Sequence, residues 1–132
     1  MKSNDRRTEH MLALLDEIVA CQQEVDRCRH DYQSLERDLE AKSTHNLSPD
    51  EKEAIMREIA TLNREFEAKI NLLYEDLNER LIRGHDLACA LGHGIGHDFK
   101  IFWDYMTGAT KEEVKTERVL SDIAHIKNNL HL

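Results

Sequence analysis

Turn-forming residues are scarce in this sequence. Its 132 residues include five glycines and one proline, whereas charged residues make up 33% and apolar residues 40%. This composition is typical of long helices, and no segment shows the alternating apolar pattern of a strand. The sequence therefore predicts an all-α protein, and its length fits a single domain over residues 1–132.

Long apolar runs and a basic surface are also missing. No stretch approaches the roughly 20 apolar residues of a membrane span, and the N-terminal segment has no apolar core of a signal peptide. The net charge is −8 and is spread evenly along the chain, so no basic face is available for nucleic-acid phosphates. We therefore expect a cytoplasmic protein that binds neither membrane nor nucleic acid.

The three cysteines do not form a disulfide pattern. Cys21 and Cys28 are seven residues apart, a separation of about 10 Å along a helix, which is too far for a disulfide bond. We expect Cys21, Cys28 and Cys89 to be reduced and to serve as small core residues.

The clearest positive signal is a heptad pattern in the first third of the chain. Apolar residues alternate at spacings of three and four, which predicts a helix over 5–42 with a coiled-coil seam. The seam positions are Met11, Leu14, Ile18, Cys21, Val25, Cys28, Tyr32, Leu35 and Leu39. Leu12, Leu15 and Val19 widen this stripe beyond what one neighbouring helix covers. We therefore expect self-association through Ile18, Val25 and Tyr32, giving a homodimeric helical bundle.

A second helix is predicted over 48–83, and its continuation to 91 is left open. Ser48, Pro49 and Glu51 form a strong helix start, with a capping serine, a proline at the first helical position and a glutamate that completes a capping box. Because the preceding loop is short, the two helices should be antiparallel neighbours. The predicted fold is thus one elongated domain built on a long antiparallel two-helix coiled-coil hairpin.

The remaining third of the chain predicts a connector and two shorter helices. Four of the five glycines fall between Gly84 and Gly96, and because glycine weakens helices, residues 84–98 are expected to form a Gly/His-rich connector. A short aromatic helix should follow over 98–107. A capping box of Thr110 and Glu113 predicts the last helix over 110–129.

An aromatic cluster in the short helix is the best candidate for a binding surface. Phe99, Phe102, Trp103 and Tyr105 lie within seven residues. Two interpretations remain open at this point: the aromatic side chains close the open end of the hairpin, or they form a docking surface for a protein partner, since Trp and Tyr are enriched at binding hot spots.

The connector is the one segment whose side chains suit metal chemistry. His85, His93, His97 and Asp98 are ligand types for zinc or a similar ion. His93 and His97 share a face only if the intervening segment is helical, and Gly94 and Gly96 argue against a helix there. We therefore expect no metal and no cofactor. The segment also has no preceding strand and no lysine of a phosphate-binding loop.

The functional expectation is a non-enzymatic protein–protein interaction module. No residue set matches a nucleophile elbow or an oxyanion site, so we expect no catalytic residues. The module would act through its coiled-coil and aromatic surfaces, as an adaptor, a small chaperone or an inhibitor, with itself and an unidentified protein as partners. The alternative is a small metal-binding helical protein that uses residues 85–98.

Overall fold

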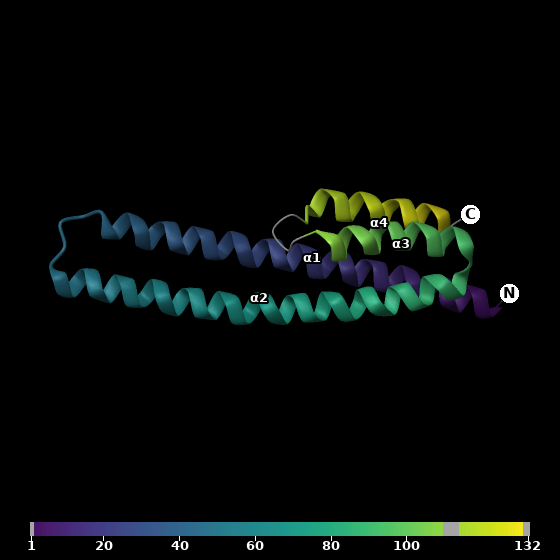
Figure 1. Cartoon of the computed structure of the whole chain (residues 1–132), viewed down its shortest axis with the longest axis horizontal. Helices are drawn as coiled ribbons and strands as arrows, with labels where there is room; N and C mark the ends of the chain where they lie inside the picture. The colour runs from purple at the N-terminus through teal and green to yellow at the C-terminus, as the bar shows by residue number, and fades with distance from the viewer. Residues whose placement is uncertain (1, 110–113, 131–132) are drawn as a thin grey trace. The chain divides into compact units, whose positions relative to one another are not determined.

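The computed structural model describes residues 2–109 and 114–130, and all regular structure in these ranges is α-helical (Figure 1). The four helices are α1 (Lys2–Ser43), α2 (Pro49–Leu91), α3 (His93–Gly108) and α4 (Thr116–Leu130). The predicted all-α class is confirmed. None of the helices described here is long and apolar enough to cross a membrane.

The helix start predicted at Ser48 is present. The Glu51 backbone N–H donates to Ser48 Oγ at 3.2 Å, and the Ser48 hydroxyl lies 3.0 Å from Glu51 Oε1. The serine thus caps an otherwise unsatisfied backbone donor, as a capping box requires. The Glu51 carboxylate accepts a hydrogen bond from the Ser48 hydroxyl. In the usual form of the motif, this carboxylate accepts a hydrogen bond from the backbone N–H of the serine.

The connector predicted over 84–98 is replaced by helix at every residue except Gly92. α2 continues to Leu91, and α3 begins at His93, five residues before the expected start. Gly92 has a φ of 124°, a conformation that side-chain-bearing residues rarely adopt. Its carbonyl accepts the Gly96 N–H at 2.9 Å, which forms the first helical hydrogen bond of α3.

Gly84 shows why glycine does not end α2. A Cβ atom placed on Gly84 would lie only 2.6 Å from Phe99 Cζ of α3 and 3.5 Å from Leu14 Cδ2 of α1. The missing side chain therefore lets three helices approach one another. The intrinsic helix penalty of glycine, about 1 kcal/mol, is offset by this packing, which the propensity argument did not include.

The last helix begins later than the sequence predicts. α4 starts at Thr116, and Thr110 and Glu113 of the predicted capping box lie outside the described residues. Val119, Ile123 and Ile126 are buried along one face of α4, whereas Leu120 is exposed.

The helices contribute to two compact units. Unit 1 comprises Met1–Gln23 and Glu75–Leu132, and unit 2 comprises Glu24–Tyr74. In unit 1, parts of α1 and α2 pack with α3 and α4 around one core. Its buried apolar residues are Met11, Leu14, Leu15, Ile18, Leu77, Leu81, Ala88, Phe99, Phe102, Val119, Ile123 and Ile126.

Unit 2 contains only two helical segments and has a much smaller core. Val25 and Cys28 of α1 pack with Ile70 of α2, and Phe66, Leu73 and Tyr74 lie partly buried against them. The order of these contacts along the two segments is antiparallel within the unit. The single elongated domain and the full-length coiled-coil hairpin remain predictions.

Candidate interaction surfaces

The aromatic segment of α3 divides into core residues and surface residues. Phe99 and Phe102 are fully buried and meet edge to face, with ring centroids 5.6 Å apart. An interaction surface must be accessible, so these two residues do not fit the docking role that the sequence suggested. Both rings instead belong to the core of unit 1.

Tyr105 and Trp103 are half-buried, and both contact neighbouring helices of unit 1. The Tyr105 hydroxyl accepts the Lys115 backbone N–H at 2.8 Å, and the Arg118 guanidinium lies 4.0 Å from the Tyr105 ring centroid. The Trp103 ring lies 5.2 Å from the His85 ring of α2. Tyr105 thus anchors the start of α4, and Trp103 retains only part of its surface for a partner.

The candidate metal ligands do not converge in the part of the chain that the structure describes. The Asp98 carboxylate of α3 accepts a hydrogen bond from Asn129 of α4 and lies 3.7 Å from His125 Nε2. His97 is exposed, and the His93 side chain is not among the described groups. No cluster of three or more His, Cys, Asp or Glu side chains within the described residues could hold a metal ion.

The residues chosen for self-association prove to be inaccessible or only partly accessible. Ile18 is fully buried in unit 1 and Val25 is fully buried in unit 2, while Tyr32 is half-buried. One neighbouring helix alone would leave part of the α1 stripe uncovered. In unit 1, α3 and α4 supply the missing cover, as the Lys127–Asp16 ion pair between α4 and α1 illustrates.

A polar group that the heptad pattern did not reveal lies at the edge of the unit 1 core. Gln22 is only 2% exposed, and its Nε2 donates to Thr116 Oγ1 of α4 at 3.1 Å. Arg80 of α2 lies nearby, with its Nε 3.9 Å from Glu17 Oε1. Gln22 directly follows the seam residue Cys21, so only the packing of α4 against α1 shows that it is buried.

The three cysteines differ in their exposure. Cys28 is buried, Cys21 is half-buried and Cys89, expected in the core, is exposed. Burial raises the pKa of the Cys21 thiol; Arg80 opposes this shift, while Asp76 and Glu17 add to it. A raised pKa disfavours the thiolate, which is the nucleophilic form.

Tyr32 and Phe66 mark the middle of the helix pair in unit 2. Their rings stack with centroids 4.2 Å apart. The Tyr32 hydroxyl donates to Glu36 Oε2 at 2.5 Å and lies 3.0 Å from Asn63 Oδ1. The hydrogen bond to the Glu36 carboxylate raises the pKa of Tyr32 to about 12. At one end of the unit, Arg29 donates to the Tyr74 hydroxyl, which also ties α1 to α2.

Between the Tyr32–Phe66 contact and the turn at residues 44–48, no apolar residue is fully buried. Leu39 and Leu62 are half-buried, and Leu35 is 51% exposed although it occupies a seam position. Here the two helices form an open groove of about 500 Å³. We call it the loop-end groove; its lining residues are Leu35, Asp38, Leu39, Lys42, Arg57, Glu58, Thr61, Leu62 and Glu65.

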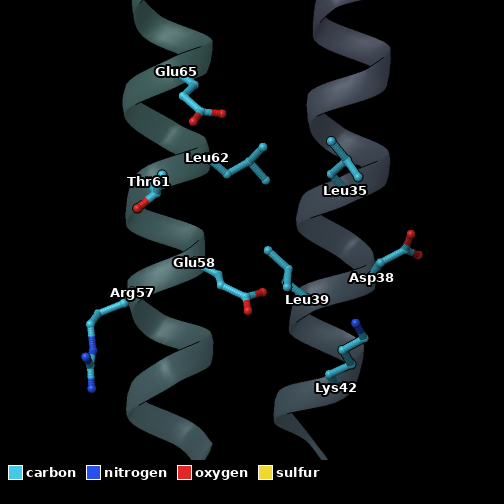
Figure 2. Close-up of a pocket in the computed structure, with 9 residues that line it drawn as sticks. All are labelled: Leu35, Asp38, Leu39, Lys42, Arg57, Glu58, Thr61, Leu62 and Glu65. Atoms are coloured by element: carbon cyan, nitrogen blue, oxygen red, sulfur yellow. The ribbon is translucent and has the colours of Figure 1, made fainter.

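Figure 2 shows how the loop-end groove is built. Leu39 and Leu62 project into the space between the helices, and Leu35 lies over α1 at the level of Leu62. Lys42 and Arg57 lie at the end nearest the turn, with the Arg57 side chain directed away from α1, whereas Glu65 lies at the opposite end. The Glu58 carboxylate also projects between the helices, so the groove combines leucine side chains with charges of both signs.

A second hollow lies between α1 and α2 of unit 1. It measures about 590 Å³ and is lined by His10, Ala13, Leu14, Glu17, Arg83, Asp86, Leu87 and Ala90. Its apolar lining is about as extensive as that of the loop-end groove, but its large apolar side chains are the buried Leu14 and the half-buried Leu87. The loop-end groove differs in having an exposed seam leucine, Leu35.

Comparisons with known proteins add no relative from which a function could be carried over. The chain matches no family model, no curated protein and no solved structure. The evidence for a function therefore comes from the surfaces of the two units.

Proposed function

We propose that this protein is a non-enzymatic helical interaction module that binds another helical protein segment in the loop-end groove. The observation that supports this proposal is the exposure of Leu35, at 51%, in the same heptad series that is fully buried at Ile18 and Val25. A seam leucine without a covering helix is a favourable contact for an added helix, because burying a leucine side chain contributes about 1.5–3 kcal/mol.

The shape and chemistry of the groove suit an amphipathic helix. A helix laid between two others buries apolar residues at spacings of three and four and leaves its polar face in water. Leu39 and Leu62 would contact that apolar stripe, and the bordering charges would orient it. The predicted roles of adaptor, small chaperone or inhibitor all use such an interface, and the predicted coiled-coil hairpin would present it.

The metal-binding alternative has no observation in its favour. The Asp98 carboxylate is already engaged by Asn129 and His125, both on α4. A role for Trp103 in docking stays a weaker proposal, because its half-buried ring already contacts His85. The loop-end groove is therefore the surface to test first.

Site-specific photo-crosslinking in the native host tests the groove. A photoreactive amino acid placed at Leu35 or Thr61 should yield a covalent protein adduct, because both positions line the groove. The matched control is Arg37, an exposed residue of the same helix that does not line the groove. Equal adducts from Arg37 and Leu35, or no adduct from either groove position, would contradict the proposed function.

A further inference from the structure

We propose that the segment that fills the loop-end groove is the same groove of a second copy of this chain, in the opposite orientation. This inference rests on the proposed function and adds a partner and a geometry to it. The two copies would be related by a two-fold axis that crosses the helices at the level of Thr61. The alignment of the two helices in unit 2 and the order of charges along them favour this arrangement.

The side-chain contacts fix which residues lie at the same level. Tyr32 stacks on Phe66 at 4.2 Å, and Leu35 lies beside Leu62 in Figure 2. Since the segments are antiparallel, each step toward the turn on α1 matches a step back along α2. Lys42 and Arg57 therefore share the end near the turn, while Asp31 and Glu65 share the other end.

Asp31 belongs to the same face as the groove. A smaller hollow of about 280 Å³ includes Asp31 and shares Leu35, Leu62 and Glu65 with the loop-end groove. On α1, Asp31, Leu35, Asp38 and Lys42 recur at spacings of four, three and four, which places them on one helix face. The face thus carries Lys42 and Arg57 near the turn and Asp31 and Glu65 at the other end. The carboxylates of Asp38 and Glu58 lie between these pairs, and Lys69 lies beyond Glu65.

This charge order distinguishes the two ways of stacking the faces. If the second copy points its turn in the same direction, α1 lies over α2 of the copy, so Lys42 faces Arg57 of the second copy and Asp31 faces Glu65 of the second copy. Both contacts are between like charges, which disfavours that arrangement.

The opposite orientation brings unlike charges together. When the second copy points its turn the other way about an axis at Thr61, each helix lies antiparallel over its own copy. Arg57 and Glu65 are four residues to either side of Thr61, so Arg57 faces Glu65 of the second copy. At the matching level of α1, Lys42 faces Asp31 of the second copy. The two-fold symmetry repeats each contact, giving four favourable charge contacts.

The isolated chain leaves these charges accessible for the contact. Within the described part of the chain, neither Lys42 nor Glu65 forms an ion pair. Arg57 lies 3.8 Å from Glu53 one turn away, with both side chains largely exposed, and such surface pairs contribute little. The symmetric contact would also bury Leu35, Leu39 and Leu62 from both copies, forming the four-helix core that unit 2 alone lacks.

Sedimentation analysis of the full chain tests the proposal. The wild-type protein should be a dimer at micromolar concentration. Arg57→Glu should weaken the dimer about tenfold or more, because it places like charges at two symmetric contacts. The double variant Arg57→Glu with Glu65→Arg should restore the wild-type affinity to within about threefold, because it exchanges the two charges. Arg37→Glu is the matched control and should leave the affinity unchanged.

Several outcomes would overturn this inference. One is a wild-type protein that is monomeric at about 100 µM, because any association would then lie above the micromolar range. Another is an Arg57→Glu variant that dimerises as well as Arg37→Glu does. The third is a double variant, Arg57→Glu with Glu65→Arg, that does not recover the dimer. Far-UV circular dichroism of each variant confirms that the helices are retained.

The photo-crosslinking experiment separates this inference from the proposed function. An adduct with the mass of two chains supports both. An adduct of another mass from Leu35, absent at Arg37, supports the proposed function and overturns the second-copy inference. The absence of any adduct overturns both.

Discussion

Units 1 and 2 share two continuous helices but differ in how completely those helices are covered. In unit 1, α3 and α4 pack on the α1 and α2 segments, and seam residues such as Met11 and Ile18 are fully buried. In unit 2, the same heptad series has one neighbouring helix, and Leu35 is 51% exposed. A heptad pattern therefore identifies which face of a helix is apolar, whereas the number of helices that pack on this face decides whether it is buried.

The charges of the two units reflect the same difference. Unit 1 connects its helices through specific polar contacts, among them Gln22 with Thr116 and Asp98 with Asn129. Unit 2 has such contacts as well, between Tyr32 and Asn63, but its loop-end groove keeps Lys42 and Glu65 without an ion pair in the described chain. The groove is therefore left with surface that a partner can complete.

The largest expected difference between the units concerns their cores. Phe102→Ala should lower the free energy of unfolding by about 3–5 kcal/mol, because it leaves a cavity at a fully buried site. Ile59→Ala in unit 2 should cost only about 1 kcal/mol, because Ile59 is half-buried and the site can collapse. Urea unfolding followed by circular dichroism measures both values, and similar costs for the two variants would remove the contrast between the units.

Two glycines of unit 1 provide a sharper test of close helix packing. Gly84→Ala should lower stability by about 1–3 kcal/mol, because its Cβ would lie 2.6 Å from Phe99 Cζ. Gly94→Ala is the matched control: no atom lies within 4 Å of its Cβ position, so helix propensity should raise stability by up to about 1 kcal/mol. Thermal melting would contradict the packing argument if both variants changed stability in the same direction.

A smaller effect is expected at the buried polar contact of unit 1. Gln22→Ala removes the 3.1 Å hydrogen bond to Thr116 and should cost about 1 kcal/mol. Gln23→Ala alters the exposed neighbouring residue and should stay within about 0.5 kcal/mol of the wild type. Equal unfolding midpoints for the two variants would show that Gln22 does not stabilise the contact between α1 and α4.

The smallest effect concerns Tyr32 in unit 2 and depends on pH. Its pKa is raised to about 12, chiefly by the hydrogen bond to Glu36, so folding favours the neutral phenol. The resulting stabilisation is complete below the ordinary tyrosine pKa of about 10 and is lost as the pH rises through about 12.

Ultraviolet titration of tyrosinate absorbance can follow this group, with Tyr32→Phe identifying its signal. Glu36→Gln should move the ionisation of Tyr32 toward lower pH, because the carboxylate acceptor is lost. An unchanged Tyr32 titration in the Glu36→Gln variant would contradict the assigned cause.

Sequence periodicity predicted the first helix and the start of the second well. The heptad from Met11 to Leu39 lies within α1, and the capping box at Ser48 and Glu51 forms as expected. These features are encoded locally, within one or two turns, so a single sequence is enough to recognise them.

The features that were missed depend on contacts between distant residues. The path of α2 through Gly84 depends on Phe99, fifteen residues further along the chain. The aromatic spacing of α3 identified an apolar face but could not tell whether that face meets a partner or the core. Likewise, Leu14 and Leu35 are equivalent in the heptad, and only the positions of α3 and α4 distinguish the buried residue from the exposed one.

Hydrogen exchange of the full chain at two concentrations tests the central claim most directly, because association protects only the surface that it covers. Between about 1 µM and about 100 µM, protection of backbone amides in residues 31–42 and 57–65 should increase, while that of unit 1 should stay constant. Concentration-dependent protection in unit 1, or none anywhere in the chain, would contradict the account of unit 2 as the surface completed by a second copy.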